Sequence, residues 1–303
     1  MRTRLETIIP LKTPMVVIIE PSSICNQSCW FCPTGQSMGI KELMTWEAFG
    51  KVLESLKQFK SPIKVIRLYK NGEPLLNGLL EKMIIALKDS NVANRIEITT
   101  NGTLFTPCRN KSILEAGVDQ VNISCNPISL ANDEYFRNIE DLFIQRRNCK
   151  IRIKAIAECL GAGEKDYFFK KFTPVSDEIL LEHLQPNWPG FDVEYPFETV
   201  DVGHRGQDIC EREVCPYIFY CMVINANGTV SACVQDWNRK LIMGDVKNTS
   251  LVDIWNSSTF NNIRKVHLRK ERKHQLVCHE CGVLKYGSLD NIDQYADELI
   301  EKF

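Results

Sequence analysis

The stretch "MVVIIEPSSICNQSCWFC", residues 15–32, decides how this chain is interpreted. Its five apolar residues, 15–19, have the length of a buried strand, and the loop that follows places Cys25, Cys29 and Cys32 within eight residues. Three thiols so close together suit three irons of a cubane iron–sulfur cluster. A structural zinc site usually takes four protein ligands, and no fourth cysteine or histidine is near this loop in the sequence. The spacing therefore predicts a cluster with one iron open to a further ligand.

Size and charge restrict the number of domains and the classes of binding partner. The chain has 303 residues, of which 44% are hydrophobic, enough for one large domain or a large and a small one. The chain has a net charge of −1 and therefore lacks the basic excess that is typical of a nucleic-acid binder. The basic run at 267–274 is interpreted as a solvated loop. No segment approaches the ~20 apolar residues of a membrane span or the apolar core of a signal peptide. We expect a cytoplasmic protein with no nucleic-acid or membrane partner.

The chain has thirteen cysteines, and most of them are clustered. Because disulfides are disfavoured in the cytoplasm, clustered thiols indicate metal binding or catalysis. A second group extends from Cys210 to Cys233, and residues 278–281 read CHEC. The isolated cysteines are interpreted as small buried hydrophobic residues: Cys108, Cys125, Cys149 and Cys159.

Strand and helix patterns alternate through the first two thirds of the chain. Short β-rich runs occupy residues 15–20, 63–69, 95–100, 120–125, 150–156 and 178–184. Helical patterns fall between most of them, as at 45–59 and 76–90, and Thr45 is a plausible N-cap. This alternation predicts βαβ units and a parallel sheet. Six units are too few for a complete eight-fold barrel, so the predicted fold is α/β, a partial (βα)6 TIM-like barrel.

The predicted strands carry polar residues on one parity only. These are Arg67, Tyr69, Glu97, Thr99, Asn101, Asn122, Ser124, Asn126, Arg152 and Lys154. Period-two alternation means that they line a shared interior while the other parity packs under helices. A half-exposed antiparallel sheet is the alternative, but the intervening helices argue against it. We therefore expect a site for a polar ligand at the C-terminal ends of the strands.

The pattern changes near residue 196, where turn-rich segments replace the alternation. We predict a barrel domain over 1–195, a cysteine-rich hairpin and helix domain over 196–285, and a C-terminal helix over 286–303. Residues 222–233 are predicted to form a β-hairpin that turns at 225–228. Residues 250–267 are predicted to form one helix, with Ser250 as a possible cap.

The spacing Cys-x3-Cys-x2-Cys after a first strand resembles the radical S-adenosylmethionine (SAM) superfamily. The resemblance implies that the amino and carboxylate groups of SAM chelate the open iron. In that family, reductive cleavage of SAM yields methionine and a 5′-deoxyadenosyl radical, which abstracts hydrogen from the substrate. The missing cluster ligand is then the cofactor itself.

Further segments match the SAM-binding motifs of that family. The sequence Asn71, Gly72, Glu73 and Pro74 resembles its Gly-Gly-Glu-Pro motif, with asparagine in place of the first glycine. Phe31, before the third cysteine, corresponds to an aromatic residue near adenine. The resemblance implies that polar residues at the strand ends hold the rest of SAM: Asn101, Ser124, Asn126 and Arg152.

Residues 215–281 resemble the family's C-terminal extension, which is called SPASM when full and twitch when short. The phrases "NGTV", "GDV" and "DIWNS" carry this resemblance, which implies one auxiliary [4Fe–4S] cluster. The favoured ligands are Cys215, Cys233, Cys278 and Cys281, with Cys221 or Cys210 as alternatives to Cys215. A structural zinc site on the same four thiols is the other possibility.

A closed auxiliary cluster implies electron acceptance, so we predict a two-electron oxidation of a small polar substrate such as a sugar or cyclitol. Candidates for a base in the lumen are Lys154, His183 and Tyr69, with Glu182 as an alternative to His183 because strand neighbours alternate. A flavodoxin- or ferredoxin-type protein is the expected electron donor. The alternatives are a peptide or protein maturase, a redox-neutral radical enzyme and a non-enzymatic metal-binding protein.

Overall fold

The computed structural model describes residues 3–191, 194, 201–287 and 289–303. In these residues nine strands form one sheet, in the order β6-β5-β4-β3-β2-β1-β7-β8-β9. The first six strands are parallel to one another and confirm the predicted partial barrel. They are β1 Val16–Ile19, β2 Val65–Leu68, β3 Ile96–Thr100, β4 Gln120–Ser124, β5 Lys150–Ile156 and β6 Glu178–Glu182.

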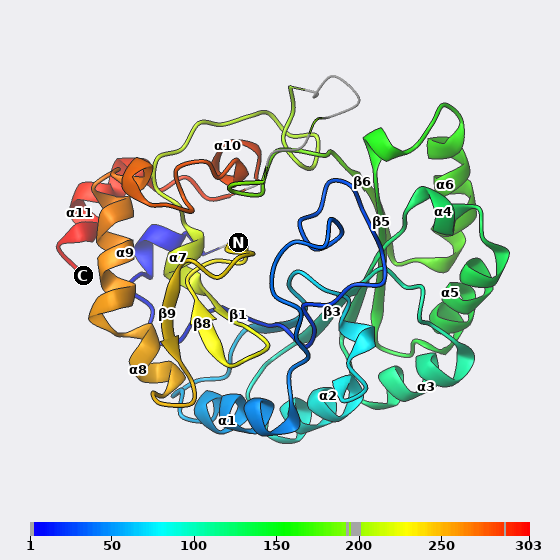
Figure 1. The fold of residues 1–303 in the computed structure, drawn as a ribbon, viewed down its shortest axis with the longest axis horizontal. Helices are drawn as coiled ribbons and strands as arrows, with labels where there is room; N and C mark the ends of the chain where they lie inside the picture. Colours follow the sequence, from blue (N-terminus) through cyan, green and yellow to red (C-terminus); the bar gives the residue numbers. More distant parts are fainter. Residues whose placement is uncertain (1–2, 192–193, 195–200, 288) are drawn as a thin grey trace.

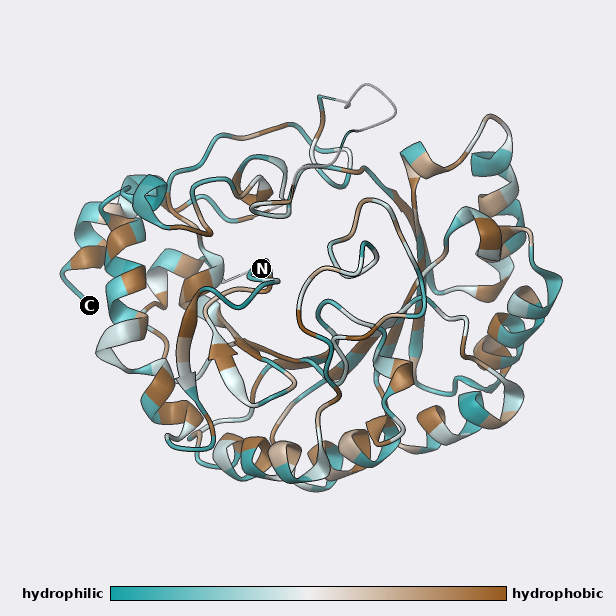
Figure 2. Ribbon diagram, viewed as in Figure 1, coloured by the Kyte–Doolittle hydropathy of each residue, from teal (hydrophilic) through white to brown (hydrophobic). Residues whose placement is uncertain are grey.

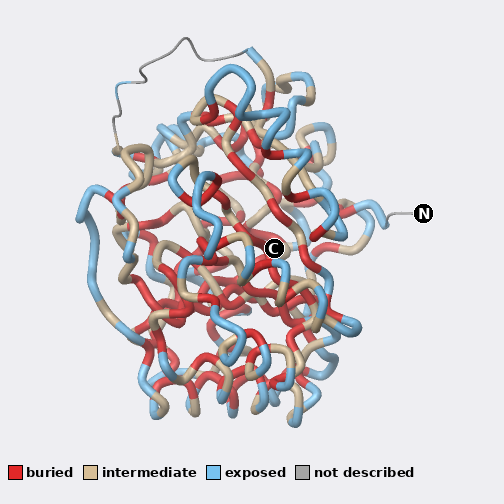
Figure 3. The backbone as a smooth tube through the Cα atoms, turned by 90° about the vertical axis from the view of Figure 1, so that its right-hand side faces the viewer, coloured by how far each residue is buried: buried red, intermediate tan, exposed pale blue. Residues whose placement is uncertain are grey.

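Helices cover the convex face of this sheet (Figure 1). They are α1 Trp46–Leu56, α2 Leu80–Asp89, α3 Pro107–Glu115, α4 Pro127–Leu130, α5 Asp133–Gln145 and α6 Glu164–Phe172. The predicted cap of the first helix is confirmed, because the Thr45 side chain accepts a hydrogen bond from the Ala48 amide at 3.1 Å. Hydrophobic residues concentrate where the helices meet the strands (Figure 2), and buried segments run through the interior while exposed loops surround it (Figure 3). The core therefore lies between sheet and helices, and leaves the concave face for polar groups.

The floor of the concave face is a polar layer rather than an open channel. Glu97 binds Arg67 at 3.0 Å and Arg95 at 2.6 Å. One strand further, the Gln120 side-chain amide donates to Asn122 Oδ1 at 2.7 Å. These pairs satisfy the buried polar groups near the middle of the strands. The space that remains for a ligand lies above them, at the C-terminal ends.

The C-terminal part continues the same sheet. Strand β7, Cys221–Ile224, pairs in parallel with β1, and β8, Thr229–Ser231, and β9, Ile242–Asp245, follow antiparallel. The predicted hairpin is confirmed, and Gly228 has a positive φ of 91° at its turn. The predicted boundary at residue 195 falls among residues outside the described ranges.

The single helix predicted over 250–267 is wrong, because the chain forms α8, Leu251–Trp255, and α9, Ser258–Leu268. Ser257 has an extended backbone, and its side chain accepts a hydrogen bond from the Phe260 amide, so it caps a new helix. The C-terminal segment is likewise not one helix. It contains α10, Val283–Tyr286, and α11, Ala296–Ile300. The remaining helix is α7, Tyr217–Tyr220, and the 3-10 helices are Leu5–Thr7, Pro74–Leu76, Ala157–Cys159, Thr173–Val175, Arg272–His274 and Asp293–Tyr295.

Within the described residues, none of the helices combines the length and apolar character needed to cross a bilayer.

Candidate active site

Two loops meet at the C-terminal end of β1 and β2. The Glu73 amide donates to the Ile24 carbonyl at 2.8 Å, so the segment 71–74 is bound directly to the cysteine loop. A Cβ atom at Gly72 would lie 2.4 Å from the Ser22 carbonyl oxygen and 2.5 Å from that of Ile24. Only glycine allows this approach, which explains why the second position of the motif has no side chain.

The carboxylate of Glu73 organises this junction. It is buried and accepts hydrogen bonds from the Leu75 amide, the Thr100 hydroxyl and the Asn101 amide at 2.9, 2.6 and 2.7 Å. Burial raises the pKa of Glu73, against the opposing effect of these donors. The side chain therefore ties β2 to β3 and leaves the backbone of the loop to face a ligand.

The thiols of Cys25, Cys29 and Cys32 lie near one another at the top of the barrel. Burial and the neighbouring thiols of Cys32 and Cys25 raise the pKa of Cys29 to about 11. In the described part of the chain, no three Cys, His, Asp or Glu side chains are already drawn together around a metal position. A partly buried set of thiols whose charged forms repel one another still suits a metal cluster, whose positive irons stabilise thiolates. The donor chemistry of this loop therefore fits the iron–sulfur cluster that its spacing predicts.

A cavity of about 370 Å³ lies between this loop and the ends of the strands. It brings together most of the predicted residues: Cys25, Cys29, Phe31, Cys32, Tyr69, Gly72, Glu73, Asn101, Ser124, Asn126 and Lys154. Asn71 and Pro74 are outside its lining, and the Asn71 amide donates instead to the Trp237 carbonyl at 3.3 Å. The cavity is a suitable space for SAM and a small substrate.

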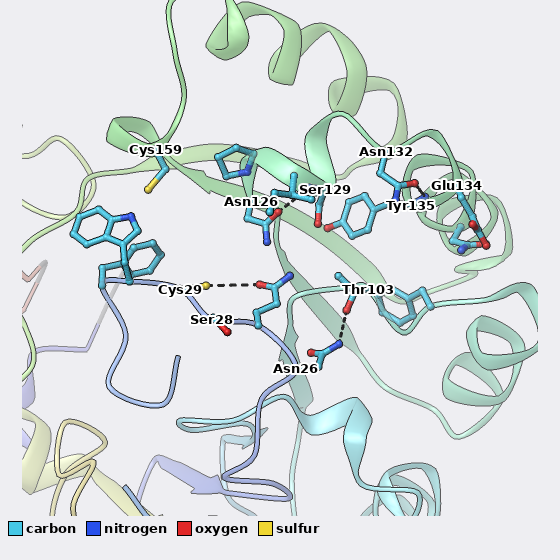
Figure 4. A pocket seen from close by; sticks show the side chains of 18 of the residues that line it. Asn26, Ser28, Cys29, Thr103, Asn126, Ser129, Asn132, Glu134, Tyr135 and Cys159 are labelled. Atoms are coloured by element: carbon cyan, nitrogen blue, oxygen red, sulfur yellow. Dashed lines mark hydrogen bonds between the residues drawn. The ribbon is translucent and has the colours of Figure 1, made fainter. Parts of the chain in front are cut away.

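A larger cavity of about 910 Å³ lies on the outer side of the cysteine loop (Figure 4). The two cavities share six lining residues, which are Gln27, Cys29, Phe31, Asn126, Pro127 and Cys159. The oxygen of the Asn126 side chain caps α4 by accepting from the Ser129 amide at 2.7 Å. Only its amide nitrogen is therefore free of that capping role for a contact with a ligand.

The prediction that Arg152 contacts SAM is not supported by its position. Arg152 precedes Lys154 by two residues on β5, so it lies about 7 Å lower in the barrel. Its guanidinium binds Glu178 at 2.7 Å and Asn122 at 3.4 Å. It belongs to the polar floor rather than to the cavity above it.

The structure places Glu182, and not His183, in the cavity, because neighbouring residues alternate on β6. His183 Nδ1 is 2.6 Å from Glu158 Oε1, away from the predicted position of a base. Glu182 Oε2 lies 2.7 Å from Lys154 Nζ and 3.3 Å from His204 Nε2. Burial alone would raise the pKa of Glu182, but the hydrogen bond from His204 and the charge of Lys154 outweigh it and lower this pKa to about 2.

His204 is a cavity residue that the sequence did not reveal. It belongs to a turn-rich segment with no strand or helix pattern, so its place could not be derived from periodicity. Its Nδ1 faces the His183 carbonyl at 2.9 Å, and the amide of His183 donates to the His204 carbonyl at 2.8 Å. Both ring nitrogens of His204 therefore lie within hydrogen-bond distance of an oxygen atom, which fixes the orientation of the ring in the cavity.

The four favoured auxiliary thiols are near enough to affect one another's pKa values, although in the described residues they do not form a ready-made metal cage. Burial and the thiols of Cys281 and Cys278 raise the pKa of Cys215, and burial, Cys215 and Cys281 raise that of Cys233. Burial followed by the Cys281 thiol raises the pKa of Cys278 to about 12. The Arg272 guanidinium, from the basic run, donates to the Cys278 carbonyl at 2.7 Å. These mutually repelling, buried thiols again fit a metal centre.

The alternative cysteines lie elsewhere. Cys221 is buried on β7 against Ile18 and Val223, and burial raises its pKa to about 12. The Cys210 thiol contacts the Glu211 carbonyl at 3.6 Å, in a partly exposed loop. Neither packs with the set formed by Cys215 and its three partners.

Comparison with known proteins agrees with this arrangement. Residues 19–158 match the radical SAM superfamily, and residues 215–282 match the SPASM iron–sulfur cluster-binding domain. The chain belongs to the radical SAM superfamily. The cofactors of this radical SAM protein are SAM and [4Fe–4S] clusters. The two matching domains and a solved AdoMet-bound structure with the same fold support this assignment.

Among curated relatives, the S-adenosyl-L-methionine-dependent 2-deoxy-scyllo-inosamine dehydrogenase of Niallia circulans is 22% identical over 92% of this chain and 96% of its own length. A GTP 3′,8-cyclase of Pelotomaculum thermopropionicum is 32% identical over 39% of this chain and 35% of its own. The structure of BtrN with AdoMet and 2-DOIA has a TM-score of 0.60, with 20% identity over 91% of this chain and 97% of that one. The structure of anSMEcpe with AdoMet and a Cp18Cys peptide has a TM-score of 0.63, with 16% identity over 95% and 96%.

Proposed function

We propose that this radical SAM enzyme oxidises a hydroxyl-bearing carbon of a small polar metabolite, of the sugar or cyclitol class, to a carbonyl. The mutual effects of the Cys215, Cys233, Cys278 and Cys281 thiols on their pKa values support this proposal, because they indicate four thiols in one region. A centre with four protein ligands has no open position for substrate, so an auxiliary cluster there suits electron transfer. The similarity to a cyclitol dehydrogenase along nearly the whole of both chains supports the same reaction class.

When bound, SAM and the two clusters supply the hydrogen-abstracting radical and the acceptor for one electron. In balance, the substrate carbon would give its hydrogen atom to the 5′-deoxyadenosyl radical, which becomes 5′-deoxyadenosine. The substrate hydroxyl would give a proton to a base, and the remaining electron would be accepted by a cluster held by the auxiliary thiols. A carbonyl remains. A separate electron, from a flavodoxin- or ferredoxin-type donor, is consumed in cleaving SAM.

We assign the metal ligands to two sets of thiols. Cys25, Cys29 and Cys32 hold the first cluster, and Cys215, Cys233, Cys278 and Cys281 hold the auxiliary one. The segment from Asn71 to Pro74 presents its backbone to SAM, with Glu73 fixing that backbone. The cavity residues that contact the rest of SAM are Phe31, Asn101, Ser124 and Asn126.

The substrate is held by the opposite wall of the cavity. Lys154 and His204 donate to Glu182 and present a compact cluster of charges suited to hydroxyl and amino groups. Tyr69 lines the same space. Glu182 replaces His183 as the proton acceptor. As the substrate radical gives up its electron, its hydroxyl becomes that of a protonated carbonyl, which is strongly acidic. A carboxylate of low pKa can therefore take that proton.

The peptide-maturase alternative has weaker support. Its structural counterpart, anSMEcpe, shares the fold at 16% identity. A cavity of about 370 Å³ with a clustered set of charges suits a compact polar molecule. A peptide substrate would need an extended groove into this cavity.

Two measurements test the proposal. Protein purified without oxygen and reconstituted should contain about eight irons per chain, falling to about four when Cys25, Cys29 and Cys32 are changed to alanine. A panel of aminocyclitols deuterated at the carbinol carbon should then give deuterated 5′-deoxyadenosine and a ketone. About four irons plus one zinc in the unaltered chain would contradict the electron-acceptor role.

A further inference from the structure

Lys70 is a buried lysine that the reaction described above does not use. It is 8% exposed and lies between β2 and the segment 71–74, where it lines the cavity. Its Nζ donates to Asn225 Oδ1 at 2.7 Å and to the Asp236 carbonyl at 3.0 Å. Burying an ammonium without a direct carboxylate partner is unfavourable, so this position calls for an explanation.

A closed set of hydrogen bonds fixes Lys70 in place. The Asn225 amide donates to Ser231 Oγ at 3.0 Å, and Ser231 Oγ donates to Asp236 Oδ2 at 3.0 Å. Asp236 also accepts from the amides of Lys240 and Leu241 at 2.7 and 2.9 Å. The lysine therefore has little freedom to leave its site.

This site adjoins an auxiliary thiol. The Asp236 amide donates to the Cys233 carbonyl at 3.3 Å, and the Gln235 amide lies 3.4 Å from Cys233 Sγ. Lys70 thus contacts the turn that holds Cys233, while it also borders the space assigned to SAM and substrate. The Lys70 side chain therefore connects the turn that holds Cys233 with the cavity.

Lys70 lies among charged groups of both signs. The groups that act on it are the carboxylates of Glu20 and Asp236, the guanidinium of Arg239 and the Cys233 thiol. Glu20 is fully buried and binds Arg239 at 3.1 Å. Arg239 also binds Glu42 at 2.8 Å. Two cations thus face three carboxylates, and loss of Lys70 would leave this region one unit more negative.

We propose that Lys70 is a positioning residue for the auxiliary cluster, whose fixed positive charge beside Cys233 raises the reduction potential of that cluster. A cation held in a region of low dielectric stabilises the form that has gained an electron. The auxiliary cluster is thereby able to accept the electron released by substrate in the adjoining cavity. This inference rests on the proposed function.

The test uses protein in which Cys25, Cys29 and Cys32 are alanine, so that only the auxiliary cluster gives a signal. Its midpoint potential is measured by redox titration followed by electron paramagnetic resonance. Lys70→Gln should shift the potential to more negative values, and Lys70→Arg, which keeps the charge, should restore most of it. Lys154→Gln is the matched control, because this lysine lines the same cavity but pairs with Glu182, and it should leave the potential unchanged.

An unchanged potential in Lys70→Gln would overturn the proposal, as would an equal shift in Lys70→Arg. If Lys70→Gln does not hold the cluster, Glu20→Gln examines the same charge balance with the opposite sign and should move the potential upward. No shift there would also overturn it. Zinc in place of iron in the triple alanine protein would instead reject the proposed function, and Lys70's role with it. An intact auxiliary cluster whose reduction potential does not change would reject only the proposed role of Lys70 and not the proposed function.

Discussion

At the scale of single residues, Gly72 shows how close contact joins the segment 71–74 to the cysteine loop. Gly72→Ala would place a methyl group 2.4 Å from the Ser22 carbonyl, a backbone atom that cannot move aside easily. We expect about 3 kcal/mol of destabilisation and loss of the first cluster. Thermal unfolding and iron content of the anaerobic protein measure both effects.

The control for that change is nearby. At Gly78 an added Cβ would meet no heavy atom within 4 Å, so Gly78→Ala should change stability by less than about 0.5 kcal/mol. If Gly72→Ala were as stable and as rich in iron as Gly78→Ala, the close junction of the two loops would be wrong.

Glu182 is the residue whose environment is most specialised for chemistry. Glu182→Gln removes the negative charge that holds Lys154 and His204 together. We expect ketone formation to fall at least 100-fold while SAM cleavage continues, because SAM contacts other residues. The ratio of 5′-deoxyadenosine to ketone, measured by chromatography, distinguishes a loss of ketone formation from a loss of SAM cleavage.

Glu178 provides a matched change on the same strand. It binds Arg152 in the polar floor, below the cavity, and half of its side chain is exposed. Glu178→Gln should keep that ratio unchanged and alter stability by no more than about 1 kcal/mol. If both variants raised the ratio of 5′-deoxyadenosine to product equally, Glu182 would act only through the stability of the barrel.

At the scale of elements, Ser257 divides what the hydrophobic pattern presents as one helix. Ser257→Ala removes the acceptor for the Phe260 amide and should cost about 1 kcal/mol, or roughly 2 °C in Tm. The adjoining Ser258 is exposed and does not cap, so Ser258→Ala should leave Tm unchanged. Equal effects from the two changes would contradict the break between α8 and α9.

The elements that follow a regular period were predictable from sequence, whereas those set by single contacts were not. The strands of the barrel alternate polar and apolar residues, and the structure confirms all six. The same alternation correctly predicted that Lys154 lines the cavity. It could not show that Arg152, which points to the same side of β5, lies below the cavity in the polar floor. Height in a barrel depends on strand stagger, which no local pattern encodes.

Long-range partners mark the other limit of prediction. His204 reaches the cavity through hydrogen bonds with His183, and Lys70 is fixed by Asn225 and Asp236, far away in sequence. The contacts of Lys70 require β7 to pair with β1, which brings the residues that follow β7 to the barrel. The cysteine spacings were informative over similar separations, because clustered thiols have few chemical roles.

At the scale of the whole molecule, one continuous sheet joins the barrel to the hairpin of β7 and β8, which precedes Cys233. Strand β7 extends the sheet at β1, the strand that leads into the first cysteine loop. The auxiliary region therefore cannot move independently of the SAM site without breaking strand pairing. A rigid connection of this kind suits electron transfer, which depends on a short and constant separation between centres.

This arrangement yields a prediction that separates the ligand candidates. Cys215→Ala should reduce the iron content from about eight to about four per chain, and should abolish ketone formation while SAM cleavage persists. Cys221→Ala should retain both clusters, because Cys221 packs with Ile18 and Val223. Cys108→Ala, at an exposed isolated cysteine, is the control for thiol loss. If Cys221→Ala lost four irons and Cys215→Ala kept them, the auxiliary centre would have to form around β7, and the cage of Cys215, Cys233, Cys278 and Cys281 would be wrong.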